Sequence, residues 1–437
     1  MLQRGKMIAG ALGALALLTG SSFAQDAQPQ IASVIHAGRL LADPSNGRVL
    51  SEQSILVGSD GRIIGVEAGY VTPAGATVID QRNRFVMPGL IDSHVHLRST
   101  LSAQRIYDPV LLNEADVALR AAENARITLD HGFTTVADLG APNNAIFALR
   151  RAVNEGRIVG PRIIASGSSV TPDGGHGDAQ GFQHEVLDVL RSESACSGAD
   201  ECRRAVRRQI QAGADIIKIT ATGGVLSNTA AGVAQQLTDD ELQAIVQAAH
   251  SMGRRVTAHA HGVDGINAAL RAGVDSIEHG SYLDRESVRL LRQNDRYLIP
   301  TLLAGWWVGQ LAEQGGTLTP AQTEKARQVS RDMATMGRFA RQNGVRIAFG
   351  TDTGVSPHGM NAREFQLLVE AGFTPLQTLQ MATVNAADHL QLNGTAGRIA
   401  SGYSADIIAV NGDPTQDVGV LMQVPFVMAR GTAFKDE

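Results

Sequence analysis

The sequence predicts an α/β fold in which a (β/α)8 TIM barrel carries a small β-sandwich domain built from the two ends of the chain. Eight short apolar runs alternate with amphipathic helical stretches across residues 87–390, which is typical of parallel strands that close into a barrel. The two ends show short apolar runs separated by turn residues, which favours antiparallel strands. An open doubly wound sheet is the alternative, but no Gly-x-Gly-x-x-Gly motif follows the first barrel strand.

Residues 1–24 have the pattern of a cleaved signal peptide. Arg4 and Lys6 precede an apolar run over residues 7–18, and Ala24 closes a small-residue cleavage site. A membrane anchor is the alternative, but a bilayer span needs about 20 apolar residues, and this run is shorter. We therefore expect a secreted or periplasmic protein with no stable membrane span.

The β-sandwich domain is predicted from two separate segments, residues 25–86 and 391–437. In the first segment, Ser59, Asp60 and Gly61 form a hairpin turn between two apolar runs. The second segment has similar apolar runs at 405–410 and 424–428. We expect the two ends of the chain to pair into one sandwich.

The barrel is predicted over residues 87–390, because amphipathic stretches end in glycine and a short β-rich run follows each of them. The glycines are Gly132, Gly213, Gly253, Gly273 and Gly344. The eight expected strands lie near residues 90–96, 134–138, 162–166, 215–220, 256–260, 275–279, 297–301 and 346–351.

The composition limits the partners. The formal net charge is −5 and the basic residues are scattered, so the sequence offers no basic surface to nucleic acid. We expect a small-molecule or dipeptide substrate and a homo-oligomer. Cys196 and Cys202 are expected to form a small-loop disulfide, because export would place them in an oxidising compartment. Two thiols with a metal or redox role are the alternative.

Metal-binding side chains follow the predicted strands at their C-terminal ends, where TIM barrels place their active sites. His94 and His96 end the first strand, and both imidazoles face the same side because strand side chains alternate. The fifth, sixth and eighth strands end in His259, His279 and Asp352. A structural histidine can occur at any one of these places, but five such ligands on one rim favour a metal site.

Lys218 lies inside the apolar run of the fourth strand, where an unpaired ammonium would be costly to bury. Burial should lower the pKa of its amine. A neutral lysine amine can add carbon dioxide to become a carbamate, whose two oxygens can bridge two cations. The alternative is a lysine that extends to the rim or pairs with a carboxylate.

These residues and their surroundings resemble the binuclear branch of the amidohydrolase superfamily over nearly the whole mature length. Similar proteins carry a His-x-His pair after a Pro-Gly-Leu/Phe-Ile-Asp lead, a carboxylated lysine on strand four, histidines that end strands five and six, and an aspartate that ends strand eight. The matching residues here are His94, His96, Lys218, His259, His279 and Asp352.

Four further motifs resemble the exported Xaa-Pro dipeptidase and carboxypeptidase-like branch, some of whose relatives hydrolyse ochratoxin. They lie at residues 131–136, 174–177, 217–227 and 258–262. The second strand departs from the pattern, because it reads Val136-Ala137-Asp138 where relatives often have Arg before Asp. We therefore expect that the substrate specificity of this chain can differ from that of these relatives.

The resemblance implies a metal-dependent hydrolase that cleaves the amide bond of dipeptides or N-acyl amino acids. Two divalent metal ions, expected to be zinc, would hold a bridging hydroxide that attacks the amide. Asp352 would take up the proton and pass it to the leaving nitrogen. The implied ligands are His94, His96 and Asp352 for the more buried ion, His259 and His279 for the outer ion, and Lys218, N-carboxylated by CO2, as the bridge.

Two further histidines are candidates for substrate binding. His176 lies between glycines in the loop after the third strand, and flanking glycines let a ligand approach closely. His261 shares the strand face of His259 by periodicity. Either could instead be a histidine without a role. Trp306 and Trp307 could line an apolar pocket or simply pack between helices.

Three other functions compete with amide hydrolysis. A lactone or phosphotriester hydrolase would use the same binuclear centre, because activated water attacks many electrophiles. A mononuclear deaminase would not need Lys218, and it usually carries a glutamate after strand five, where this chain has His261-Gly262. A non-catalytic periplasmic binding protein would need neither Lys218 nor Asp352 at the rim.

Overall fold

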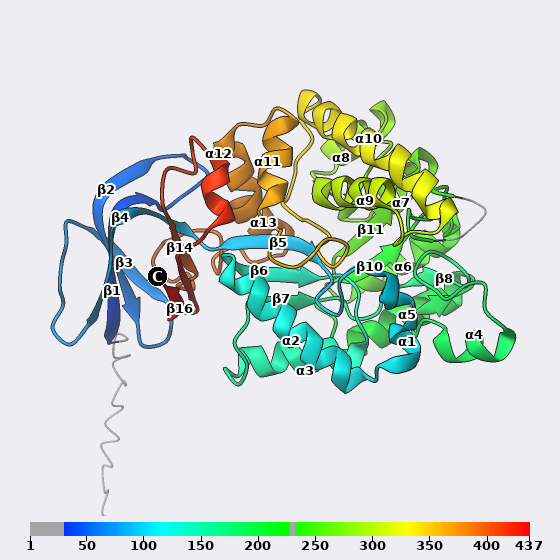
Figure 1. Ribbon diagram of the computed structural model, residues 1–437, viewed down its shortest axis with the longest axis horizontal. Coiled ribbons are helices and arrows are strands. Elements are labelled where there is room, and N and C mark those ends of the chain that lie inside the picture. Colours follow the sequence, from blue (N-terminus) through cyan, green and yellow to red (C-terminus); the bar gives the residue numbers. More distant parts are fainter. Residues whose placement is uncertain (1–29, 228–231) are drawn as a thin grey trace, which may run out of the picture.

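The computed structural model, which describes residues 30–227 and 232–437, begins and ends in one mixed β-sheet. Its strands are hydrogen-bonded in the order β16-β15-β14-β4-β1-β2-β3. β1 and β4 run parallel and the other neighbours run antiparallel, so the two chain ends meet as predicted (Figure 1). The seven strands are β1 (Ile31–Leu41), β2 (Val49–Gly58), β3 (Ile63–Ala68), β4 (Thr77–Pro88), β14 (Ile407–Val410), β15 (Phe426–Ala429) and β16 (Thr432–Asp436).

The prediction of a sandwich is wrong in one respect, because these strands form a single sheet. β4 pairs with β1 on one side and with β14 on the other, so the hydrogen-bond ladder is continuous. The sheet curves instead, and Ile63 N of β3 donates to Tyr403 O, just before β14, at 2.8 Å. Ile55 and Phe426 are fully buried in the core that the curved sheet encloses.

Between β4 and β14, seven parallel strands alternate with helices along the chain. They are paired in two groups, β5-β6-β7 and β10-β11-β12-β13. The predicted eighth strand is reduced to an isolated parallel bridge between Leu298 and Ile347. The strands are β5 (Leu90–Val95), β6 (Phe133–Asp138), β7 (Arg162–Ala165), β10 (Ile217–Thr220), β11 (Val256–Ala260), β12 (Ser276–His279) and β13 (Tyr297–Ile299).

Backbone hydrogen bonds link the two groups of parallel strands on both sides. Val170 N, just after β7, donates to Lys218 O of β10 at 2.9 Å. On the other side, Ile347 bridges to Leu298 of β13. Two residues later the chain reaches β5, where Ser93 N donates to Phe349 O at 2.8 Å. The C-terminal ends of the parallel strands therefore surround one common space.

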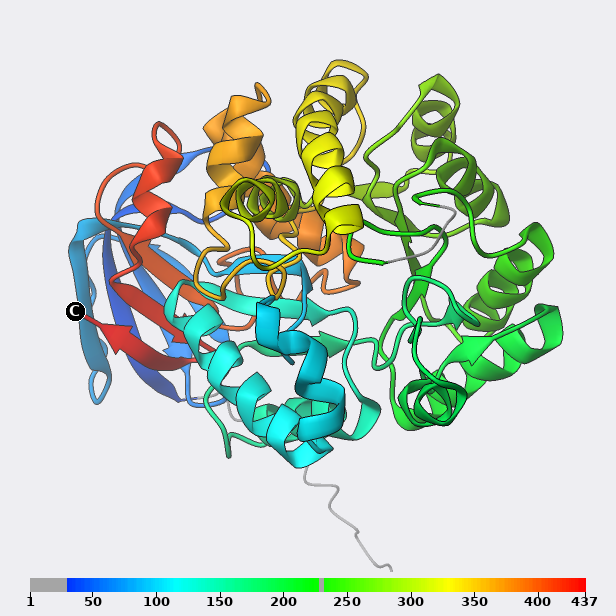
Figure 2. The same ribbon diagram turned by 45° about the vertical axis from the view of Figure 1, so that its right-hand side comes forward.

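Helices surround these strands in both views (Figures 1 and 2). Gly213 and Gly273 end α5 (Ala199–Ala212) and α7 (Val263–Ala272) with φ of +116° and +102°, a left-handed conformation that glycine adopts without strain. The remaining elements are the 3-10 turns Ala103–Tyr107 and Val418–Met422, the π-helical turn Met381–Asn385, α1 (Asp108–Leu111), α2 (Glu114–Asp130), α3 (Asn143–Asn154), β8 (Thr171–Pro172), α4 (His184–Leu190), β9 (Ala195–Cys196), α5 (Ala199–Ala212), α6 (Asp239–Ser251), α7 (Val263–Ala272), α8 (Arg285–Gln293), α9 (Leu302–Gln314), α10 (Pro320–Gln342), α11 (Arg363–Glu370), α12 (Pro375–Gln380) and α13 (Ala386–His389).

The segment predicted as a signal peptide, residues 1–24, lies outside the described residues. Across residues 30–227 and 232–437, none of the helices has the length and apolar character needed to cross a bilayer. Export of the chain stays a prediction.

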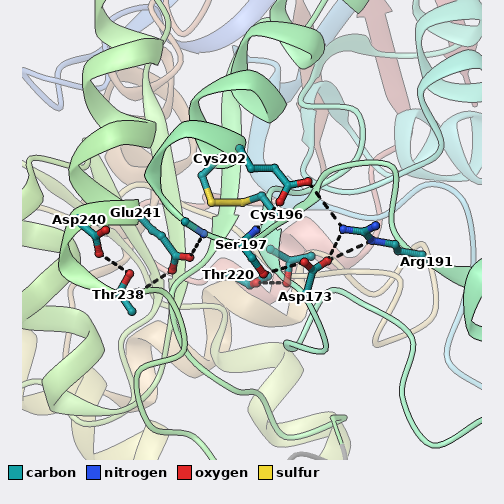
Figure 3. Close-up of a disulfide and its surroundings, with 12 residues drawn as sticks. Asp173, Arg191, Cys196, Ser197, Cys202, Thr220, Thr238, Asp240 and Glu241 are labelled. Carbon is teal, nitrogen blue, oxygen red and sulfur yellow. Dashed lines mark hydrogen bonds and ion pairs between the residues drawn. A yellow bond between two sulfur atoms is a disulfide. The ribbon is translucent and has the colours of Figure 1, made fainter.

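Cys196 and Cys202 form a disulfide, as predicted, with their Cα atoms 5.0 Å apart. Cys196 lies in β9, which pairs with β8, and Cys202 lies in α5. Beside this bond, Asp173 accepts hydrogen bonds from Arg191 Nη2 at 2.6 Å and from Ser197 Oγ at 2.7 Å (Figure 3). The disulfide thus joins the base of the long loop between β8 and β9 to a helix.

Replacing both cysteines by alanine should lower the free energy of unfolding by about 2 kcal/mol, because the unfolded chain regains the entropy that a short closed loop removes. Denaturant titration of the double variant against the wild type measures this change. Free-thiol titration of unfolded, unreduced wild-type protein should find no reactive thiol. Two reactive thiols per exported chain would contradict the disulfide.

Candidate metal centre and active site

His94, His96 and Asp352 bring their ligand atoms together at the end of β5. Asp352 Oδ1 lies 3.2 Å from His96 Nε2 and 3.5 Å from His94 Nε2. Ligands about 2.1 Å from a tetrahedral zinc ion are themselves about 3.4 Å apart. The three atoms therefore have the spacing of ligands around one metal ion.

The second ring nitrogen of each of these histidines is held by another group. His94 Nδ1 donates to Glu278 Oε2 at 2.7 Å, and His96 Nδ1 donates to Gly140 O at 3.2 Å. Burial alone would raise the pKa of Glu278, but His94 and Lys218 keep that pKa below its usual value. Fixing Nδ1 in this way presents Nε2 to the shared space, as in metal-binding histidines.

Lys218 places its amine directly against this group. Its side chain is 4% exposed, and its Nζ donates to His94 Nε2 at 3.2 Å. Burial lowers the pKa of Lys218, while the negative charges of Glu278 and Asp352 oppose the shift. The site therefore favours a neutral amine, the form that reacts with carbon dioxide.

His259, His261 and His279 form a second group, with ligand atoms within 4.8 Å of one another. The rings of His261 and His279 stack with their centroids 4.8 Å apart. His279 Nδ1 donates to Thr301 Oγ1 at 2.7 Å, and His261 Nδ1 lies 2.7 Å from Ser281 Oγ. Burial lowers the pKa of all three imidazoles, which favours the neutral form that binds metal.

The two groups lie next to each other, and each contains one residue with a strained backbone conformation. The ring centroids of His94 and His279 are 5.4 Å apart. His279 and Asp352 have φ of +70° and +58°, in the left-handed region that costs a non-glycine residue about 1 kcal/mol or more. Such strain persists where the surrounding contacts fix a functional side chain.

His176 comes from the loop after β8 and covers the second group. Its ring stacks on His259 with the centroids 4.2 Å apart, and its backbone N donates to Gln236 Oε1 at 2.9 Å. A Cβ added to Gly224 would lie 2.3 Å from His176 Cε1, so glycine is required there. Burial, with the charges of His261 and other neighbours, lowers the pKa of His176 to about 3.

Asp92 forms hydrogen bonds with the segment that carries Asp352. It is fully buried and accepts hydrogen bonds from Thr351 Oγ1 at 2.6 Å and Asn361 Nδ2 at 2.8 Å. Burial raises the pKa of Asp92 to about 7, although these hydrogen bonds oppose the shift. The network fixes the turn in which Asp352 adopts its positive φ.

The structure brings all the predicted site residues together at the ends of the parallel strands. They are His94, His96, Lys218, His259, His279 and Asp352, with His176 and His261. His261, predicted as a substrate contact, lies within the second ligand group. Sequence reasoning missed Glu278, although an acid inside an apolar strand was the same kind of signal that identified Lys218. It also missed Asp92, two residues before His94 on the same strand face.

Trp306 and Trp307 lie on α9 and are partly buried against the main hydrophobic core. The guanidinium of Arg363 lies 5.4 Å from the ring centre of Trp306. In these contacts, Trp306 and Trp307 pack between helices. A substrate pocket at this place stays a prediction.

Parallel strands with histidines, a lysine and an aspartate gathered near their C-terminal ends are the arrangement expected of a hydrolase active site. The chain belongs to the amidohydrolase family, whose model matches residues 85–433.

Several relatives are similar along most of the chain. An ochratoxinase of Aspergillus niger is 33% identical over 432 residues, covering 92% of this chain and 86% of the relative. A solved Xaa-Pro dipeptidase with bound methionine in its active site is 36% identical, with a TM-score of 0.87, and covers 92% of this chain and 99% of that one. A prolidase complexed with N-methylphosphonate-L-proline is 31% identical, with a TM-score of 0.83, and covers 93% and 100% of the two chains.

Glu278→Gln should weaken divalent-metal binding about 10- to 100-fold, because the amide keeps the size of the side chain but removes the charge that orients His94. Competition with a metal-sensitive dye measures the affinity. Glu123→Gln, at an exposed position of α2, is the matched control. Unchanged metal affinity in a folded Glu278→Gln protein would contradict the orienting role.

Proposed function

We propose that this hydrolase uses two metal ions to cleave the amide bond of dipeptides or N-acyl amino acids. The observation that carries the proposal is the pairing of two ligand groups, His94-His96-Asp352 and His259-His261-His279, beside the buried amine of Lys218. The ring of parallel strands fits a (β/α)8 barrel, in which such a site lies at the C-terminal ends. The similarity to an ochratoxinase and to a Xaa-Pro dipeptidase supports the amide-bond class.

The residues present fit two divalent ions, with zinc as the expected metal. His94, His96 and Asp352 would hold one ion, because their atoms already have the required spacing. His259 and His279 would hold the other. Lys218 would serve as the bridge after its neutral amine adds CO2 and releases a proton, which leaves a carbamate anion. When bound, the two ions would lower the pKa of a shared water and polarise the scissile carbonyl.

The side chains of this chain would then manage the protons and the substrate. Asp352 would accept a proton on its carboxylate and deliver it to the leaving nitrogen, acting first as base and then as acid. His176, which stacks on His259, would donate a hydrogen bond to the carbonyl oxygen of the substrate. Glu278 would keep His94 in the tautomer that binds metal through Nε2.

Two further properties belong to this proposal. The signal-peptide pattern of residues 1–24 favours export to the periplasm or beyond, where dipeptides or N-acyl amino acids would be met. A homo-oligomer is also proposed, and size-exclusion chromatography with light scattering tests it.

A substrate screen with metal analysis tests the proposed function. Purified mature protein should contain about two divalent ions per chain and should hydrolyse members of a panel of Xaa-Pro dipeptides, N-acyl amino acids and an ochratoxin-type phenylalanine amide. A lactone and a phosphotriester belong in the same panel. Hydrolysis of only these last two would replace the amide proposal by the alternative on the same centre.

Asp352→Asn should lower kcat about 10²- to 10⁴-fold with little change in KM, because the amide retains size but accepts no proton. Steady-state kinetics on the best amide substrate measures the loss. Metal analysis of the same sample must show unchanged content, since Asp352 is also a proposed ligand. Near-normal turnover in the metal-replete variant would move the proton transfer to another residue, with His176 the first to be tested.

A further inference from the structure

Lys325 is a cation that neither the metal site nor the proton transfer uses. It lies on α10, about one turn from the start of the helix, and is partly buried. Its Nζ donates to Gly224 O at 2.8 Å and also to Ser227 O. Both acceptors belong to the loop that follows β10, the strand that carries Lys218.

Lys325 reaches the active site through this loop. Gly224 packs against the ring of His176, where a Cβ would lie 2.3 Å from Cε1, and His176 stacks on His259. A continuous chain of contacts therefore runs from Lys325 Nζ through Gly224 and His176 to His259.

The charge of Lys325 has no counter-ion within the described part of the chain. No carboxylate forms an ion pair with Nζ across residues 30–227 and 232–437, and burial alone lowers the pKa of Lys325. Residues 228–231 contain no acid. A partly buried ammonium without a carboxylate partner is costly unless a ligand supplies one.

Holding the loop does not by itself require this charge. Gln322, one turn before Lys325 on the same helix, donates from Nε2 to Leu226 O at 2.6 Å. A neutral side chain thus already ties α10 to the loop. An ammonium has three N–H groups, and the two carbonyl contacts leave one of them for a ligand.

We propose that Lys325 binds the free carboxylate of the amino acid whose amide bond is cleaved, while the loop carbonyls hold its Nζ in place. This inference rests on the proposed function, because it assigns the recognition of the substrate to the same site. It makes a free carboxylate next to the scissile amide a requirement for good substrates. Uncapped dipeptides and N-acyl amino acids meet that requirement, whereas their carboxamides do not.

The test compares kcat/KM for an N-acyl-L-phenylalanine and for its carboxamide in three proteins: wild type, Lys325→Met and Gln322→Met. Lys325→Met should lower kcat/KM for the acid about 10- to 100-fold and change that for the carboxamide less than about threefold. Gln322→Met removes a loop contact from the same helix but keeps the charge, so it should affect both substrates equally. An equal loss on both substrates in Lys325→Met would overturn the proposal and leave Lys325 as a loop anchor.

A binding measurement keeps this test separate from the proposed function. Calorimetric titration of the metal-loaded proteins with L-phenylalanine and L-phenylalaninamide needs no turnover. The wild type should bind the acid more tightly, and Lys325→Met should lose that preference. If the wild type hydrolyses no amide but binds the acid more tightly, and Lys325→Met loses this preference, the carboxylate site is supported and the proposed reaction is wrong. If Lys325→Met keeps the preference, the carboxylate site is wrong whether or not the enzyme cleaves amides.

Discussion

The charge state of one buried lysine constrains the whole site. Lys218 lies inside a strand with its amine 3.2 Å from His94 Nε2, in a space where imidazoles outnumber carboxylates. An ammonium there would repel any metal ion that the histidines bind. Burial already lowers its pKa, and Glu278 and Asp352 only partly oppose this shift. Addition of CO2 to the neutral amine, with loss of a proton, would give a carbamate and provide the anion that two cations need.

The surrounding structure keeps the other groups in the forms that this charge balance requires. Burial lowers the pKa of the histidines in the second group, which favours the neutral imidazole that metal binding requires. Glu278 and Thr301 hold His94 and His279 through Nδ1. The loop of His176 is fixed at its base by Asp173 and by the disulfide (Figure 3). These contacts position His94, His279 and the loop of His176 within the protein itself, which would limit the ordering cost of metal binding.

Much of this site could be predicted from the sequence, because a βα repeat places each strand end at the same rim. His94, His259, His279 and Asp352 each end an apolar run, so local pattern alone located them. Lys325 gave no such signal, because it lies on a helix far along the chain from that strand and meets the site through the packing of α10 on the loop after β10. The single curved sheet was likewise missed, since periodicity shows that strands exist but does not show which edges they share.

Anomalous diffraction from crystals of the metal-loaded mature protein tests the central claim most directly. The account predicts two anomalous peaks at the metal absorption edge, one beside His94, His96 and Asp352 and one beside His259 and His279. It also predicts electron density for a carbamate on Lys218 between the two peaks. A single peak, with density for an unmodified Lys218 amine, would contradict the binuclear account.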